Sequence, residues 1–452
     1  MSIQELGYLD FFGEKCFYVQ EGMDYILLPV DEGANIYRHY LEENYLLSIS
    51  SRHNSKCVAS VKKQRGFGTH GVCLELNYIA KRHLNELIDG FVMTGNEIDE
   101  FFSPLEYYSW IRRQDKYEQV DLLYNQEIIA DYSFCYKGRQ INVQLAFGNV
   151  LSPGIRSDLT IHPKLIVSFE STDDTDFVFG VSNVLVRFLQ FVHRKRTYNI
   201  ANLNLFKKTG VEQISFIGYM FGSLYNRDLR ASSRIDASFV YYGDKIDKLL
   251  DLIAQENGFP VNHLSQNTGD RYNYKTERIG AISAAFEYEY NKSDAVSQKS
   301  IFECPITKQN LLDFIDQMKN LHSEENADSF LEIAANKVSA IGTQVGLKQK
   351  IVNAFQVNKG ALESSSEWLF ARNKSVEKVA DAFSRLRGKV LHYDSGHRFS
   401  DTEIEVITFI EVLQFVMVLK RAKYTDAEIE LILGPQYNCN DKYMEILMKS
   451  DS

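Results

Sequence analysis

The segment from Arg385 to His392 combines residue types that can act together on a phosphodiester. It reads Arg-Leu-Arg-Gly-Lys-Val-Leu-His, so two arginines and a lysine stand close to one histidine. A neutral imidazole can take a proton from a ribose 2′-hydroxyl or give one to a leaving 5′-oxygen, and a guanidinium can stabilise the charge that builds up on phosphate oxygens. The segment therefore has the groups for RNA cleavage without a metal ion, with His392 as the acid and base and one of the two arginines, Arg385 or Arg387, as the stabilising cation.

Basic residues are concentrated around this segment. Residues 372–398 contain seven Arg or Lys against three Asp or Glu, whereas the whole chain has 50 Lys and Arg against 60 Asp and Glu, a formal net charge of −10. Such a chain does not coat nucleic acid uniformly, so an RNA site has to be a local basic patch. We expect Arg385, Lys389 and Arg398 to bind RNA phosphates in this patch. A second interpretation stays open, in which these cations are solvated and simply favour the C-terminal end of a helix.

Two arginines compete for the position beside His392. In a helix, Arg385 lies on nearly the same face as His392, whereas Arg387 lies about 140° away around the axis. A bend or unwinding near Gly388 would bring Arg387 and His392 together. Similar Arg-to-His spacings occur in a glycine-rich loop, an extended segment and a helix of the first half (Arg65 to His70, Arg156 to His162 and Arg187 to His193). Only the Arg385 to His392 segment ends a capped helix within a region of helices.

Two histidines and two cysteines offer a different chemistry. His53, Cys57, His70 and Cys73 have the spacing of zinc-finger ligands, and Zn²⁺ prefers four such ligands in a tetrahedron. The alternative is that Cys57 and Cys73 are ordinary buried thiols, because each lies in or beside an apolar run. The sequence has no GxxxxGK[ST], GxGxxG, HExxH or GxSxG motif, which removes the commonest nucleotide-binding, zinc-protease and hydrolase classes. No cofactor is expected.

Two hydrophobic patterns divide the chain. Up to about residue 230, short apolar runs rich in Tyr, Phe, Val and Ile predict β-strands, with one helix in their midst. After about residue 240, apolar residues recur every three or four positions, which predicts helices. We therefore expect an α+β protein with a β-rich domain at 1–235 and an all-α domain at 236–452. The strands are expected at Cys16–Val19, Tyr25–Val30, Gly71–Tyr78, Ile128–Tyr136, Ile141–Phe147 and Leu165–Phe169. The helices are expected at Val181–Val192, Lys245–Gln255, Ile279–Tyr290, Thr307–Leu321, Phe330–Ile341, Val345–Phe355, Ser375–Leu391, Asp401–Leu419 and Thr425–Leu433.

The longest apolar run, from Val406 to Leu419, lies in the helical half. It is interrupted by Glu411 and Gln414, and it is well short of the roughly 20 residues that cross a bilayer. Its apolar residues cover more than one face of the helix, so either its own bundle or a second protomer has to bury it. The first residues carry acids rather than a signal peptide, and the six cysteines form no CxxC pair, so we expect a cytoplasmic protein without a membrane anchor.

The helical half resembles the HEPN superfamily, and within it the ApeA-like anti-phage defence proteins. The resemblance rests on Arg387-x4-His392, on the following helix ITFIEVLQFVMVLKRA, and on the segments FVYYGDKIDKLLDLIAQE and AAFEYEYN. It is supported more weakly by VLVRFLQFVHRKRTYNI in the first half, which otherwise matches by architecture only. Members of this family usually carry a polar residue after the motif Arg, whereas this chain has Gly388.

The resemblance implies a metal-independent endoribonuclease that cleaves a structured RNA, such as tRNA, during abortive infection. It favours Arg387 over Arg385 as the cation that stabilises the transition state beside His392. It also implies a homodimer or larger homo-oligomer in which the motifs of two protomers meet at one phosphate. The β-rich domain would then sense a phage-encoded trigger or restrain the nuclease. Two alternatives remain open. One is a non-catalytic HEPN module that dimerises and binds nucleic acid or a protein, because its motif is degraded at Gly388. The other is a β-rich ligand-binding domain joined to an ordinary helix end.

Overall fold

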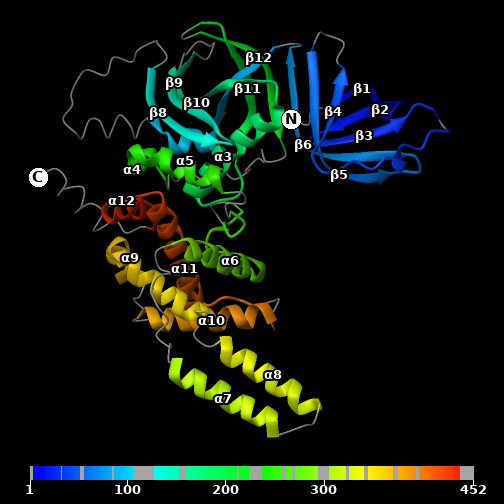
Figure 1. Ribbon diagram of the computed structural model, residues 1–452. Coiled ribbons are helices and arrows are strands. Elements are labelled where there is room, and N and C mark those ends of the chain that lie inside the picture. Colours follow the sequence, from blue (N-terminus) through cyan, green and yellow to red (C-terminus); the bar gives the residue numbers. More distant parts are fainter. Residues whose placement is uncertain are drawn as a thin grey trace, which may run out of the picture. The chain divides into compact units, whose positions relative to one another are not determined.

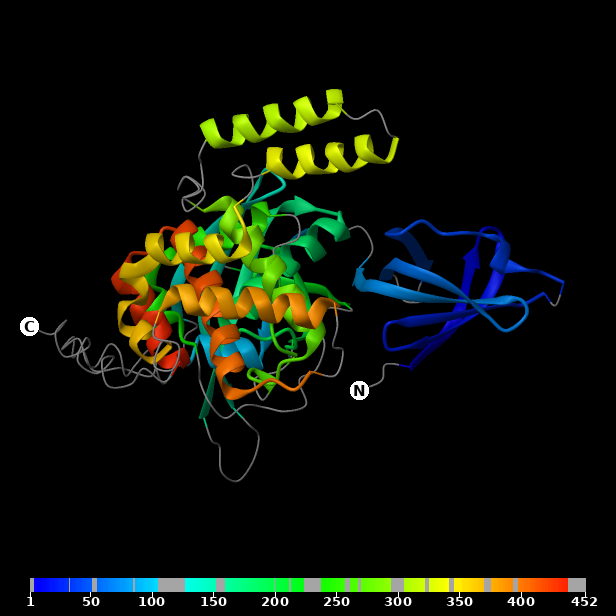
Figure 2. The ribbon, with the colours of Figure 1, turned by 90° about the horizontal axis from the view of Figure 1, so that it is seen from below.

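A computed structural model describes most of the chain (Figures 1 and 2). The described residues are 4–31, 33–50, 55–83, 86–104, 127–151, 159–198, 200–210, 213–222, 237–256, 261–266, 270–293, 305–321, 325–340, 345–369, 375–392 and 397–437. The chain divides into two compact units. The first consists of Met1–Val261 and Ser265–Arg271, and the second of Asn262–Leu264 and Tyr272–Ser452. Strands build the first unit and helices build the second, which confirms the predicted α+β class.

In the described part of the first unit, twelve strands form one antiparallel sheet. They are β1 (Gln4–Phe11), β2 (Glu14–Glu21), β3 (Asp24–Pro29), β4 (Tyr45–Ser50), β5 (Ser55–Phe67), β6 (Gly71–His83), β7 (Ile88–Gly95), β8 (Glu127–Tyr136), β9 (Arg139–Leu151), β10 (Leu159–Thr172), β11 (Ile200–Lys208) and β12 (Ile214–Gly222). Their order is β1-β2-β3-β6-β12-β11-β7-β10-β9-β8, and β5 joins β4 to β6. The six predicted strand segments coincide with β2, β3, β6, β8, β9 and β10.

The helix α3 (Thr175–His193) packs on this sheet, as the spacing of its apolar residues predicts. Phe177 of α3 lies against Tyr136 of β8 and Phe169 of β10, with ring centroids 5.8 and 5.4 Å apart. A side chain at Gly180 would collide with the hydroxyl of Tyr136, so glycine allows this close approach. Among the described residues, α3 is the one helix long and apolar enough to cross a membrane, but 67% of it is buried within the protein, as in a core helix.

The boundary between the units lies later than the sequence suggests. The short helices α4 (Phe239–Tyr242) and η2 (Gly243–Lys245) and the longer α5 (Ile246–Gln255) belong to the first unit, not to the helical domain predicted at 236–452. The apolar face of α5, including Leu249 and Ile253, is buried, and the helix packs against β8 and α3. Part of the sequence that resembles the HEPN family, FVYYGDKIDKLLDLIAQE, therefore lies outside the helical unit. Two further short elements of the first unit are η1 (Ile36–Arg38) and α1 (Asn96–Phe101).

The described part of the second unit consists of seven helices, all of them predicted from the apolar period. They are α6 (Thr276–Lys292), α7 (Pro305–Leu321), α8 (Glu325–Ala340), α9 (Leu347–Leu369), α10 (Val376–His392), α11 (Asp401–Arg421) and α12 (Asp426–Tyr437). A capping box between Ser400 and Glu403 starts α11, and Thr425 and Glu428 exchange the same pair of hydrogen bonds at the start of α12. The helices α6, α9 and α10 pack around α11.

The helix α11 is the core of this unit, and every residue from Val406 to Leu419 is buried. Glu411 interrupts the apolar run because it has buried partners. It accepts hydrogen bonds of 2.6 Å from both the Tyr274 hydroxyl and the Arg278 guanidinium. The sequence allowed two ways to bury this helix, and one of them was contact with a second protomer. That surface is not available for dimerisation, because the helix is already covered within one chain.

Candidate functional site

The motif helix α10 is amphipathic, and this decides which of its side chains are accessible. Val379, Phe383, Leu386 and Val390 are buried and recur at intervals of four, three and four residues. They pack α10 against α6, α9 and α11. The helix is unbroken from Val376 to His392, so the basic residues of the motif lie on a regular helix rather than on a loop.

Arg387 lies at the edge of the packed face and contacts α6. Its guanidinium is 3.4 Å from the carboxylate of Glu287, which is also 2.8 Å from the ammonium of Lys350 on α9. The Nε of Arg387 is buried and donates no hydrogen bond to a described residue. We call Glu287, Lys350 and Arg387 the Arg387 cluster. It holds two cations against one anion, so it keeps a net positive charge and an unused N–H group.

Arg385 and Lys389 lie on a different face of α10. They are four residues apart and both exposed, so they are neighbours on the solvent side of the helix. Arg385 is 80% exposed and pairs with Asp381 at 2.8 Å, and Lys348 of α9 reaches the same carboxylate at 3.2 Å. Arg385 and Arg387 are two positions apart in the helix, which places them about 200° apart around its axis. The structure therefore does not bring the predicted phosphate-binding residues Arg385 and Lys389 to the same surface as Arg387.

A second histidine lies beside the predicted site. The Nδ1 of His397 is 3.4 Å from the Lys389 ammonium, and its Nε2 is 3.1 Å from the Glu403 carboxylate. Burial raises the pKa of Glu403, but hydrogen bonds from the backbone and hydroxyl of Ser400 and from His397 outweigh it, so the pKa is lowered overall. Arg398 is exposed next to this histidine. The end of α10 and the start of α11 thus carry Lys389, His397 and Arg398 in one short stretch of surface.

His392 is the last residue of α10, and its side chain lies outside the described part of the structure. The backbone nevertheless answers one question that the sequence raised. The helix continues through Gly388, so the expected bend or unwinding at this glycine does not occur. Residues five apart in an unbroken helix are about 140° apart, and residues seven apart lie nearly in line. Arg385, rather than Arg387, is therefore the arginine on the His392 side of the helix.

Three side chains of this region were not found from the sequence. Glu287 and Lys350 join the Arg387 cluster from helices far away in the chain, and no local pattern indicates their role. Glu403 was recognised only as a cap, although it also binds His397. The one signal that the sequence offered for these residues was a charged side chain on a helix face that is otherwise apolar. Such side chains are common and do not by themselves indicate a site.

The four possible zinc ligands do not form one site. In the β5–β6 pairing, Cys57 lies opposite Lys81 and Cys73 lies opposite Arg65. The two cysteines are therefore eight strand positions apart along the pair of strands. At about 3.3 Å per residue this is roughly 26 Å, far more than two ligands of one zinc ion allow. Burial raises the pKa of Cys57 to about 11, which disfavours the thiolate that zinc needs. The zinc interpretation therefore fails for Cys57 and Cys73, and the alternative of ordinary buried thiols is confirmed for both. His53 lies outside the described residues.

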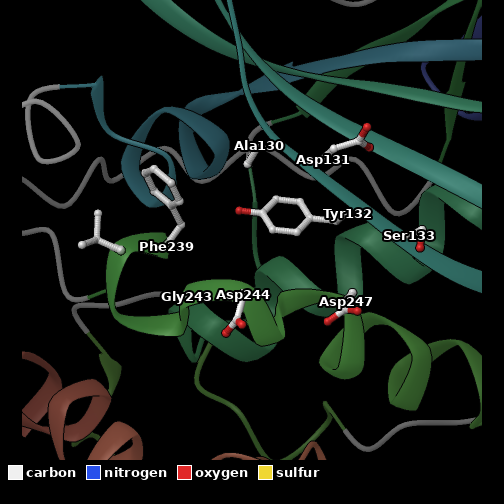
Figure 3. A pocket seen from close by; sticks show the side chains of 9 residues that line it. Ala130, Asp131, Tyr132, Ser133, Phe239, Gly243, Asp244 and Asp247 are labelled. Atoms are coloured by element: carbon white, nitrogen blue, oxygen red, sulfur yellow. The ribbon is translucent and has the colours of Figure 1, made fainter. Parts of the chain in front are cut away.

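A cavity of about 440 Å³ lies in the first unit, between β8 and the α4–α5 segment (Figure 3). Tyr132 and Phe239 contribute aromatic surface, and Asp131, Asp244 and Asp247 contribute carboxylates. Among the residues that the structure describes, none in the lining is basic. Three carboxylates repel a phosphate backbone, so this cavity is unsuited to RNA.

No protein-family model, curated protein or solved structure matches the chain. The HEPN resemblance rests on sequence motifs alone.

Proposed function

We propose that the helical unit is a metal-independent endoribonuclease of the HEPN type, which acts on structured RNA in the cytoplasm. The observation that carries this proposal is the Arg387 cluster, in which a guanidinium with an unused, buried N–H group stands on the helix that ends at His392. A phosphate oxygen is the acceptor that such a group lacks, and a charge-assisted bond to it is strong. By the family resemblance, the RNA is tRNA, the active species is a homodimer or larger, and the role is abortive infection.

The reaction assigns one role to each group. The ribose 2′-oxygen attacks phosphorus as its proton passes to a base, and the 5′-oxygen leaves as it takes a proton from an acid. The products end in a 2′,3′-cyclic phosphate and a 5′-hydroxyl. His392 of one protomer acts as the base, His392 of a second protomer acts as the acid, and Arg387 stabilises the charge on the pentacoordinate phosphorus. Arg385, Lys389 and Arg398 bind the flanking phosphates, which requires RNA to displace the Asp381 contact of Arg385.

A second candidate function is favoured by the straightness of α10. Because the helix is unbroken at Gly388, Arg387 and His392 are about 140° apart, and Arg387 is held by Glu287. A module of this kind binds RNA or a partner protein without cleaving it. In both cases, the β-rich unit senses a phage-encoded component or restrains the helical unit.

The deciding experiment is incubation of the purified chain with total tRNA in excess EDTA. The variants are His392→Ala, Arg387→Ala and Arg385→Ala, and the matched control is Lys378→Ala, which removes an exposed cation from the first turn of the same helix. We expect wild type and control to cleave, and His392→Ala and Arg387→Ala to lose about 10²–10⁴-fold in rate. Arg385→Ala should lose less. Circular dichroism establishes that each variant is folded.

Four results separate the candidates. Cleavage at the wild-type rate by both His392→Ala and Arg387→Ala would refute the assigned site. A greater loss in Arg385→Ala than in Arg387→Ala would transfer the role to Arg385. RNA binding on a filter without cleavage would select the non-catalytic module, and a strict need for Mg²⁺ with 3′-hydroxyl products would contradict an Arg and His mechanism.

A further inference from the structure

The helices α7 and α8 form a hairpin whose apolar surface is only partly covered. They lie side by side in Figures 1 and 2, and three residues separate the end of α7 from the start of α8, so they run antiparallel. Several large apolar side chains on this hairpin are exposed to solvent. They are Leu311 (44%), Phe314 (58%), Leu321 (76%), Phe330 (71%) and Ile333 (56%).

These side chains follow the spacing of a packed helix face. On α7, Leu311, Phe314, Met318 and Leu321 are separated by three, four and three residues, the heptad pattern by which helices associate. Ile315, which is buried, widens the same stripe. An apolar stripe of this width needs more than one neighbouring helix to cover it, and α7 packs on α8 alone among the described helices with substantial contact.

Both exposed stripes lie on one side of the hairpin. In each helix the exposed side chain immediately precedes the more buried one: Phe314 precedes Ile315, and Phe330 precedes Leu331. Successive residues are about 100° apart around a helix. In both helices, the exposed stripe is therefore rotated in the same sense away from the more buried residues. Because the helices are antiparallel, equal displacements place both stripes on the same face. We call this face, with the five exposed residues above, the hairpin face.

We infer that the hairpin face is a dimerisation surface whose occupant is the hairpin of a second copy of this chain. Two identical hairpins related by a two-fold axis bury the same residues on both sides and form a four-helix bundle. Each helix is about 25 Å long and two helices are about 20 Å wide, so the flat face measures about 500 Å². The accessible surface of the face is larger than its flat area, because side chains project from it. A stable interface buries roughly 800 Å² of accessible surface on each partner. The inference rests on the proposed function for the expectation of a dimer, while the surface follows from the side chains alone.

The test is the mass of the full chain in solution, measured by light scattering and sedimentation without RNA. We expect wild type at micromolar concentration to have twice the 52.0 kDa of one chain. The double variant Phe314→Lys/Phe330→Lys should be monomeric, with a dissociation constant raised about 100-fold or more, because each buried charge occurs twice in a two-fold interface. The matched control is Phe216→Lys on β12, which replaces a phenylalanine of the same 58% exposure and should remain dimeric. Phe314→Leu keeps the stripe apolar and should also remain dimeric.

A wild-type monomer at these concentrations would overturn the inference. So would a dimer that survives Phe314→Lys/Phe330→Lys, or one that dissociates equally in Phe216→Lys, because the interface would then lie elsewhere. Circular dichroism and the unfolding midpoint separate loss of the dimer from loss of the fold. A dimer that depends on the hairpin face but cleaves no RNA would refute only the proposed function.

Discussion

The guanidinium of Arg387 on α10 lies 3.4 Å from the carboxylate of Glu287 on α6, and these two residues are one hundred positions apart in the chain. The ion pair connects the motif helix to the body of the helical unit. It also means that the cation expected to bind phosphate already has an anionic partner. In the proposed function, an RNA phosphate therefore has to compete with Glu287 for Arg387.

Neutralising Glu287 should strengthen RNA binding. In Glu287→Gln, Arg387 and Lys350 lose their anionic partner, and a negative charge within a few ångströms of the bound phosphate disappears. At the effective dielectric of a protein surface such a charge is worth about 1 kcal/mol or more, so the affinity for tRNA should rise about fivefold or more at low salt. The measurement is a filter-binding titration at two salt concentrations. Glu277→Gln, an exposed acid on the same helix, is the control, and an equal gain in that variant would mean that only net charge matters.

Gly388 should be replaceable, because an added Cβ meets no atom within 4 Å. Glycine inside a helix costs about 0.5–1 kcal/mol relative to alanine, so Gly388→Ala should raise the free energy of unfolding by this amount. Gly388→Asn introduces the kind of polar residue that HEPN proteins usually carry after the motif Arg. If that residue positions phosphate, cleavage should quicken about tenfold, which corresponds to 1.4 kcal/mol of transition-state stabilisation. The comparison is the single-turnover rate of both variants, and equal rates would show that the polar group has no role.

The buried ion pair between Glu411 and Arg278 should be costly to break from one side. The two groups are 2.6 Å apart and their side chains are 2% and 11% exposed. Glu411→Leu removes the carboxylate 2.6 Å from the largely buried Arg278 guanidinium, so we expect a loss of about 3–5 kcal/mol in the free energy of unfolding. The double variant Glu411→Leu/Arg278→Met should lose less than Glu411→Leu alone. Urea unfolding of both variants checks this, and a double variant that is at least as destabilised as Glu411→Leu would argue against coupling.

His193 should make the first unit less stable in acid. Burial, together with the charge of Lys195, lowers the pKa of His193 to about 4, although its hydrogen bond to the Glu97 carbonyl and the Glu97 charge act in the opposite direction. Between pH 6.5 and pH 4 the unfolded chain therefore binds a proton that the folded unit excludes, and stability falls as the pH falls. The integrated loss is on the order of 3 kcal/mol. Hydrogen exchange of the α3 amides measures it.

The control for this prediction is His193→Gln, which keeps an N–H donor near the Glu97 carbonyl but does not titrate. Carboxylates also titrate over part of this range, so the informative quantity is the difference between wild type and variant. We expect the difference to grow from pH 7 to pH 4.5. The same slope in both proteins would assign the acid sensitivity to other groups.

The sequence by itself determined the fold class, half of the described strands and most of the helices. Periods of two and of three to four residues arise within one strand or one helix, so they can be read without knowledge of any partner. They predicted six strands, the helices α3 and α5, and each described helix of the second unit. The strands β1, β4, β5, β7, β11 and β12 were not predicted. The capping pattern at Thr425 and Glu428 was readable for the same reason, because its hydrogen bonds join residues three apart.

Only the tertiary structure decided how these elements use their side chains. It placed α5 in the first unit, buried α11 within a single chain, separated Cys57 from Cys73 along a hairpin, and set Glu287 against Arg387. Each of these outcomes depends on which faces meet across tens or hundreds of residues of chain. A local pattern states that a face is apolar or charged, but its partner is selected by packing in three dimensions, which a single sequence does not specify.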